Sequence, residues 1–215
     1  MAPLGATTTG PELLAVSDRD RILRALAECC AERGFAATAI EDVIGRAAVS
    51  RESFDSHFAS KEDCASAAFN KLVSDTLATL STAGAPAAGM AAAANAVLEM
   101  IAAEPAFSYL GLIGFRQGGT QRMHDAYESA ARVLSLMMER ARLGRGNGGL
   151  SYTQTRAAVG GAEALLRREL AAGRAASLPS LLPNFVYAAL VPFVGQGEAL
   201  RQAREAARWA AEEER

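Results

Sequence analysis

The run RESFDSH, residues 51–57, carries hydrogen-bonding side chains at the spacing of one helix face. Phe54 and Phe58 lie four residues apart, so they share the opposite face and point toward a core. The polar side that remains consists of Arg51, Glu52, Ser53, Asp55, Ser56 and His57. Such side chains hydrogen-bond to base edges and phosphates, and a short exposed helix fits the major groove of duplex DNA.

A seven-residue helix is not stable by itself, so neighbouring helices must hold it in place. A serine or threonine ahead of each apolar run predicts where those helices begin. The predicted N-caps are Ser17, Thr38, Ser50 and Ser60. Acidic residues follow three positions after Ser17, Thr38 and Ser60, as in a capping box. We therefore expect three short helices and a fourth that continues to about Leu80, with Gly34 ending the first.

The second and third of these helices, joined by the tight turn Ala47-Ala48-Val49, match a helix-turn-helix. Thr38 and Ser50 place two helix N-termini, which bind phosphate, on the same side as the polar run. The side chains expected to contact DNA are Thr38, Ser50, Arg51, Glu52, Ser53, Ser56, His57 and Lys61. For Arg51 and Glu52 the alternative is a solvated surface charge, and for His57 it is a ring packed against the bundle.

The segment from about Asp18 to Ala68 resembles the tetracycline-repressor (TetR) family of bacterial regulators, and the stretch that carries the resemblance is ERGFAATAIEDVIGRAAVSRESFDSHFASKEDC, residues 32–64. The Gly-Phe followed by Thr, the EDV, the VSR, the HF and the SKED each stand at the family's spacing. The resemblance implies a DNA-binding domain at 17–60 and a larger helical domain at 61–215. It also implies that the larger domain dimerises and binds a small molecule that releases the DNA.

The same stretch departs from the family in two positions. Many members have Gly where this chain has Ala48, and alanine in a left-handed conformation costs about 1 kcal/mol. Members usually carry a phosphate-contacting Tyr where Asp55 stands, and a carboxylate repels phosphate. Residues 17–63 hold seven basic and ten acidic side chains, a net charge of −3, which is unfavourable for DNA binding.

The remainder of the chain predicts an all-α bundle. Half of the 215 residues are apolar, alanine dominates, and aromatic residues make up 6%. Helices are expected at about 87–103, 105–117, 120–143, 152–172, 178–194 and 197–213. Pro192 should kink or end its helix. Residues 1–16 are rich in Thr, Gly and Pro and are expected to be a disordered arm.

The larger domain offers candidates for a ligand pocket and for a dimer interface. The expected pocket lining is Met100, Phe107, Leu110, Ile113, Met123, Tyr127 and Met137, which suits a mainly apolar ligand. The expected interface is Gly160, Gly161, Leu182, Phe185, Val186 and Leu190, in a segment that resembles actinobacterial TetR-type regulators. The alternatives are an ordinary core for the first set and helices central in the monomer for the second.

No nucleophile–base pair, metal-ligand spacing or phosphate-binding loop is present in the sequence, so we expect neither an enzyme nor a cofactor or metal. The three cysteines read as buried apolar residues, and the absence of a secretory signal predicts a cytoplasmic protein. The sequence thus favours a homodimeric DNA-binding transcriptional repressor. The alternative is a dimeric helical small-molecule-binding protein with weakened DNA binding.

Overall fold

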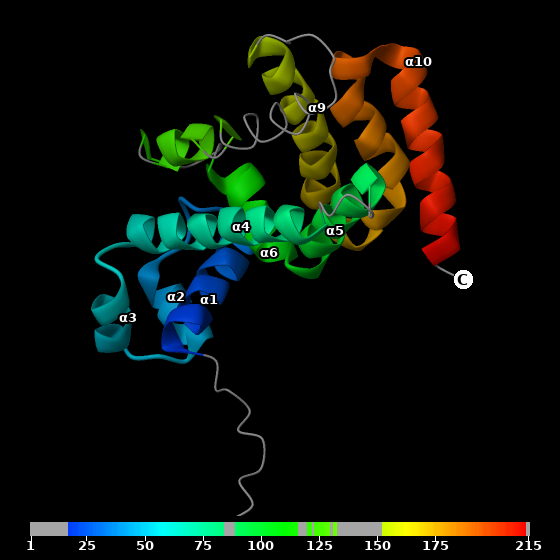
Figure 1. Cartoon of the computed structure of the whole chain (residues 1–215). Helices are drawn as coiled ribbons and strands as arrows, with labels where there is room; N and C mark the ends of the chain where they lie inside the picture. The colour runs from blue at the N-terminus through cyan, green and yellow to red at the C-terminus, as the bar shows by residue number, and fades with distance from the viewer. Residues whose placement is uncertain are drawn as a thin grey trace, which may run out of the picture.

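The computed structural model describes residues 17–83, 89–115, 120–132 except 122 and 130, and 152–213. Every regular element within these ranges is a helix, which confirms the all-α prediction (Figure 1). Three short helices form an N-terminal helix-turn-helix unit, and the other helices form a larger C-terminal region. The expected arm at 1–16 and Met137 lie outside the described residues.

The first helix, α1 (Asp18–Arg33), begins and ends as its sequence predicts. The Ser17 Oγ accepts a hydrogen bond from the Asp20 backbone N–H at 3.1 Å and donates one to Asp20 Oδ2 at 2.7 Å. At the other end Gly34 has φ +82°, and its N–H closes the last turn on the Cys30 carbonyl. Glycine permits this positive φ without steric cost.

The second helix, α2 (Ile40–Ala47), corrects the prediction for Thr38. Its N-cap is Ala39, whose N–H donates to the Asp42 carboxylate at 2.9 Å. Thr38 is buried, and its hydroxyl donates back to the Gly34 carbonyl at 2.9 Å. The hydroxyl therefore closes the turn after α1, because a buried donor must find the nearest free carbonyl.

The turn between α2 and α3 (Arg51–His57) contains a strained residue. Ala48 has φ +51° and ψ +49°, which is the left-handed region. The Val49 N–H donates to the Ile44 carbonyl at 3.3 Å and so satisfies the end of α2. Ser50 then caps α3 as predicted, because its Oγ accepts from the Ser53 N–H at 3.0 Å.

The first turn of α3 is joined to the first turn of α1 by a side-chain hydrogen bond. The Ser53 hydroxyl donates to Asp18 Oδ2 at 2.7 Å, and Arg21 Nη2 donates to the other oxygen, also at 2.7 Å. The pKa of the Asp18 carboxyl is lowered, first by the Ser53 hydroxyl and then by Arg21, since both stabilise the charged form. This bond fixes the rotation of α3 about its own axis.

The fourth helix, α4 (Lys61–Ala83), is capped by Ser60 as expected. It extends the apolar core of the N-terminal unit at residues 17–63, which we call the head, into the larger region. Buried residues of α1, α2 and α3, among them Leu26, Val43 and Phe54, form one apolar cluster with α4. The cluster continues to Phe115, whose ring stacks on Phe69 with centroids 4.5 Å apart. The head is therefore packed continuously onto the bundle.

The chain bends by 101° between α5 (Gly89–Ala103) and α6 (Pro105–Tyr109). The helix that begins at Pro105 continues as a wider π-helix, η1 (Leu110–Gly114). A Cβ at Gly111 would lie 2.5 Å from Leu72 Cδ2, so glycine permits the close approach of η1 to α4. Over the described residues, no single helix has the length and hydropathy needed to cross a bilayer, while the bent pair Ala91–Ala103 and Pro105–Gly114 meets both criteria only when taken together.

The C-terminal helices build a second apolar cluster with α5. It contains Leu98 and Ile101 of α5, Leu166 of α9 (Tyr152–Ala171) and Leu178, which lies between the short turns η2 (Ala175–Ser177) and η3 (Pro179–Leu181). The last helix, α10 (Leu182–Glu213), breaks at Gly195, with φ +77° and ψ +168°. This break three residues after Pro192 confirms the expected interruption, and the chain reverses direction there (Figure 1).

We expect the substitution Ala48→Gly to stabilise the protein by about 0.5–1 kcal/mol, because glycine removes the left-handed strain. Chemical denaturation followed by circular dichroism measures this change. The matched control is Ala207→Gly, at an exposed position inside α10, which should destabilise by about 1 kcal/mol. A loss of stability in Ala48→Gly would show that the turn is not strained in solution.

A second prediction concerns the Asp18 carboxyl. An NMR titration should give a pKa below the usual aspartate value, and Ser53→Ala should raise it toward that value. A folded-state pKa below the unfolded one stabilises the protein above pH about 4, and this contribution disappears as the pH falls through the folded pKa. Ser53→Ala should therefore weaken the acid dependence of stability. Ser56→Ala, whose hydroxyl donates to the Ser53 carbonyl, should leave the Asp18 pKa unchanged.

Candidate nucleic-acid interface

The outer side of α3 is exposed at one end of the molecule, far along the chain and in space from α9 and α10 (Figure 1). Phe54 and Phe58 are buried, at 1% and 3% exposure, and their rings lie 5.8 Å apart. The exposed residues of α3 are Arg51, Glu52, Asp55, Ser56 and His57. The structure thus brings together most of the side chains that the sequence indicated, and it leaves the His57 ring exposed.

Ser53 and Lys61 also hydrogen-bond within the protein, as the hydroxyls of Thr38, Ser50 and Ser56 do. Ser53 is half-buried and its hydroxyl is engaged by Asp18, so it positions α3. Lys61 Nζ donates to the carbonyls of Phe35 at 2.9 Å and Thr38 at 2.7 Å, and it lies 4.4 Å from the Phe35 ring centroid. An ammonium has three donors, so one N–H of Lys61 is left for a phosphate.

Arg51 is held by two carboxylates. Its Nε donates to both oxygens of Asp55, at 3.1 and 3.0 Å, and its Nη1 donates to Glu41 Oε1 at 3.2 Å. Glu41 lies in the first turn of α2, so the guanidinium bridges both helices of the helix-turn-helix. Two of its five N–H groups are occupied in this arrangement.

The other arginines of the head are also paired, with one exception. Arg24 forms a two-pronged pair with Glu104, Arg33 pairs with Asp42, and Arg46 pairs with Glu28 and Glu32. Arg46 lowers the pKa of Glu32, and the Ala39 N–H, with Arg33, lowers that of Asp42. Residue-by-residue pairing explains how a head with a net charge of −3 remains stable.

Arg19 is the exception, and the sequence analysis missed it. Among the described side chains it has no carboxylate partner, and its guanidinium lies 5.6 Å from the Phe58 ring centroid. This places an exposed cation beside the end of α3. The sequence did hold a signal for Arg19. A cation in the first turn of a helix is unfavourable for the helix dipole, so helix stability does not explain an arginine at this position.

The expected pocket residues divide between the two apolar clusters. Phe107, Leu110, Met123 and Tyr127 belong to the first cluster, Ile113 belongs to the second, and Met100 packs against the second. A single lining that contains all of them is therefore not what the structure shows. The division follows from the 101° bend, which sends α5 and α6 to different neighbours.

Two polar features of the larger region were not predicted from the sequence: the hydrogen bond between Tyr127 and Glu163, and the buried hydroxyl of Thr155. The Tyr127 hydroxyl, in the helical segment at 123–129, donates a hydrogen bond to Glu163 Oε2 of α9 at 2.5 Å. The Thr155 hydroxyl is buried on α9 and finds no partner among the described residues. Its signal in the sequence is a threonine on the apolar stripe that Ala158, Ala162 and Leu166 continue.

The expected dimer residues also divide. Leu182, Val186 and Leu190 are buried in the second cluster, which corrects their placement in an interface, since the first leg of α10 turns this stripe toward α5 and α9. Gly161 is exposed, and Gly160 and Phe185 are half-buried. A Cβ on either glycine would meet nothing within 4 Å, so this face of α9 is open.

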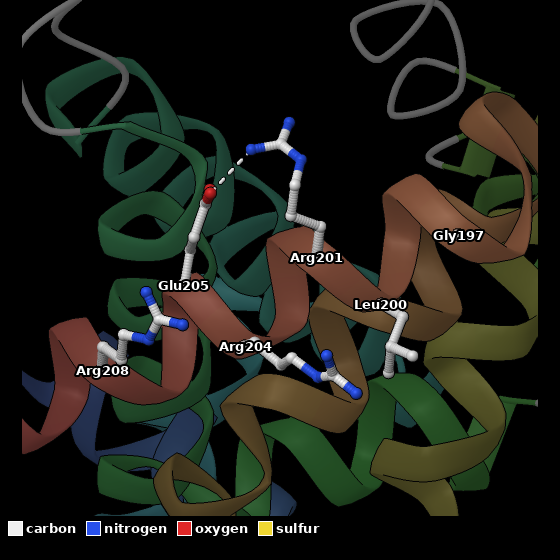
Figure 2. Close-up of a pocket in the computed structure, with 6 residues that line it drawn as sticks. All are labelled: Gly197, Leu200, Arg201, Arg204, Glu205 and Arg208. Atoms are coloured by element: carbon white, nitrogen blue, oxygen red, sulfur yellow. Dashed lines mark hydrogen bonds and ion pairs between the residues drawn. The ribbon is translucent and has the colours of Figure 1, made fainter.

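An open hollow of about 350 Å³ lies on the part of α10 that follows the break at Gly195. Gly197, Leu200, Arg201, Arg204, Glu205 and Arg208 line it, and Figure 2 shows all six on one helix. Arg201 pairs with Glu198 and Glu205. The hollow is therefore the space between long side chains of a single helix, and it is not the pocket that the sequence predicts.

Comparison with known proteins agrees with this geometry. Residues 22–68 match the model for bacterial regulatory proteins of the tetR family. The fold is similar to that of a fatty acid degradation regulator, FadR, from Bacillus halodurans, with a TM-score of 0.65 and 16% identity over 81% of this chain and 98% of that one. It is also similar to a TerR/AcrR-family transcriptional regulator from Aquifex aeolicus, with a TM-score of 0.53 and 16% identity over 90% and 99% of the two chains.

No curated protein sequence shows significant similarity to the chain. The matched segment, 22–68, runs from α1 through the helix-turn-helix into α4, and so contains all of α3 with its exposed polar side. The two structures share the helical C-terminal region as well, because they cover most of the chain. The N-terminal segment at 22–68 therefore resembles the bacterial regulatory proteins of the tetR family, and the described chain shares the all-helical fold of the two regulators.

Proposed function

We propose that the protein is a homodimeric transcriptional repressor whose α3 helices read a palindromic operator and whose DNA affinity is modulated by a small, mainly apolar ligand. The observation that carries the proposal is the exposed polar side of α3. Arg51, Ser56 and His57 face outward there, while Phe54 and Phe58 anchor the helix from within. As a DNA-binding bacterial regulator, the protein acts in the cytoplasm, where the chromosome lies.

In this proposal the contacts fall into two classes. Arg51, Glu52, Ser56 and His57 reach base edges from α3, since the side chains of a recognition helix enter the major groove. Arg19 and the free N–H of Lys61 contact phosphates beside the groove. Ser50 and Ser53 orient α3 through their hydrogen bonds to Ser53 N–H and Asp18.

The open face of α9 supports the dimer. Ala157, Gly161 and Ala164 are exposed along it, and Gly160 leaves free space above its Cα. Small residues let two helices approach closely, and the half-buried Phe185 of α10 adds apolar surface. A two-fold axis through this face would bring two α3 helices to a spacing of about one turn of DNA or somewhat more.

The contact between α1 and α6 supports ligand modulation. Arg24 Nη1 and Nη2 donate to Glu104 Oε2 and Oε1 at 3.0 and 2.9 Å, and Glu104 stands directly before α6. At the other end of α6, Gly111 of η1 packs on Leu72 of α4. The α6–η1 segment thus contacts α1 and α4, the two long helices against which α3 packs. In this proposal, a ligand that favours one position of α6 therefore changes the position of α3.

The chemistry of the surrounding clusters supports an apolar ligand with one or two polar groups. Phe107, Leu110 and Met123 provide apolar walls, while the Thr155 hydroxyl and the Tyr127–Glu163 pair provide hydrogen-bonding groups. A thermal-shift screen with apolar small molecules tests this. A library that neither raises the melting temperature nor releases DNA would contradict ligand modulation.

The second candidate function is that of a dimeric small-molecule-binding protein with a weakened head. The pairing of Arg51 with Asp55 and Glu41 favours it, because a neutralised arginine contributes less to DNA affinity. A salt titration of binding to the DNA around the protein's own gene separates the two functions. Absence of binding at low salt would favour the second candidate.

We expect Arg51→Ala to weaken binding to the operator by about 1–3 kcal/mol, because an arginine that reads a base contributes that much. Fluorescence anisotropy with a labelled duplex from the region upstream of the gene measures the loss. The matched control is Arg208→Ala, which removes an exposed arginine of α10 and should leave affinity unchanged. Equal affinities of wild type and Arg51→Ala would remove Arg51 from the reading set.

We also expect Gly161→Glu to weaken dimerisation by at least about tenfold, or 1.4 kcal/mol, because it buries an unpaired charge in the proposed interface. Sedimentation velocity over a range of concentrations measures the monomer–dimer equilibrium. Gly161→Ala, which finds open space and keeps the face small, should remain as dimeric as the wild type. If Gly161→Glu is also a dimer, the interface lies elsewhere.

A further inference from the structure

We propose that Asp55 and Glu41 make Arg51 a base-reading group, by orienting its guanidinium toward a guanine in the major groove and by excluding phosphate from it. This inference rests on the proposed DNA binding and names the specificity of that site. Asp55 and Glu41 are thus positioning residues for Arg51, and the departure at Asp55 gains a function.

The hydrogen bonds define which donors remain. Asp55 occupies the Nε–H of Arg51 and Glu41 occupies one N–H of Nη1, at 3.0–3.2 Å. Both N–H groups of Nη2 and one of Nη1 have no partner among the described residues. Guanine presents two adjacent acceptors, O6 and N7, to the major groove, and an arginine with two free terminal nitrogens matches them.

Helix stability does not explain this arrangement of charges. In α3 the cation Arg51 stands in the first turn and the anion Asp55 follows four residues later. A helix dipole favours the reverse order, with acidic residues at the N-terminus and basic residues at the C-terminus. The pair is also exposed, with 56% of the Arg51 side chain and 54% of the Asp55 side chain accessible, so it adds little to stability.

Charge then separates base from phosphate. A phosphate that approaches Arg51 also approaches the carboxylates of Asp55 and Glu41, so attraction and repulsion largely cancel. A guanine edge is uncharged and meets the free N–H groups without this repulsion. The carboxylates still have free lone pairs, which accept from the amino group of a neighbouring cytosine or adenine. The cluster of Arg51, Asp55 and Glu41 therefore binds a base edge in preference to the backbone.

The experiment compares the full-length wild type with Asp55→Ala. Each protein selects duplexes from a random-sequence DNA library, and each is then titrated with its selected duplex and with the unselected library at several salt concentrations. The wild type should select a fixed G·C pair in each half-site. Asp55→Ala should lose preference at that pair, bind unselected DNA about tenfold more tightly, and show a salt slope steeper by about one, because Arg51 gains a phosphate.

Two control variants isolate the positioning role. Glu62→Ala also removes one negative charge of the head, from α4. Among the described residues the carboxylate partners of Arg51 are Glu41 and Asp55, so the selected base pair should remain. Asp55→Glu keeps a carboxylate at the same helix position and should restore most of the preference. Circular dichroism confirms that the variants are folded, since Asp55 is exposed and outside both apolar clusters.

The outcomes distinguish this inference from the function on which it rests. Selection of the same G·C pair by Asp55→Ala, with unchanged salt slope, overturns the positioning role and leaves the proposed function intact. Loss of preference in Glu62→Ala equal to that in Asp55→Ala also overturns it, because net charge alone then explains the effect. Failure of the wild type to bind any duplex at low salt overturns the proposed function, and this inference with it.

Discussion

The structure depends on the burial of Phe54 and Phe58 in a core that α3 shares with α1, α2, α4 and the α6–η1 segment. Seven residues cannot form a stable helix in water, because nucleation costs more than so few hydrogen bonds return. The two rings supply the missing stability by packing with Leu26, Val43 and α4. Because the two apolar rings are buried in this way, the polar side of α3 faces outward, and the exposure of Arg51, Ser56 and His57 follows from the anchoring.

The same shared core joins the head to the bundle by continuous packing. The first apolar cluster runs from α1 to Phe115 and Tyr127 without interruption, so α3 does not sit on an independent module. Around this core, α6 and η1 contact α1 through Arg24–Glu104 and α4 through Gly111. A π-helical turn recurs at functional sites, and η1 lies where the two clusters meet, since Leu110 belongs to the first and Ile113 to the second.

Charge is distributed in the head as a set of local pairs, which changes how its acidity is understood. The net charge of −3 by itself suggests weak DNA binding. In the structure, however, much of this charge is neutralised locally in ion pairs such as Arg33–Asp42, Arg46–Glu32 and Arg51–Asp55. Arg19 remains accessible beside α3, and Lys61 spends two donors on the turn before α2. In the proposed DNA complex, fewer free N–H groups are then left for phosphates, so contacts with bases carry more of the binding.

The sequence by itself determined what depends on near neighbours in the chain. The caps at Ser17, Ser50 and Ser60, the all-α class, the polar side of α3 and the break after Pro192 follow from local hydrogen bonds and helical periodicity. Tertiary structure decided what depends on distant partners. The Thr38 hydroxyl turned inward to the Gly34 carbonyl, and Leu182, Val186 and Leu190 entered the core because α10 packs on α5 and α9. The sequence shows that Arg51 carries a charge, but only the meeting of α2 and α3 brings Glu41 to it, since contact between distant residues is fixed by packing and not by spacing.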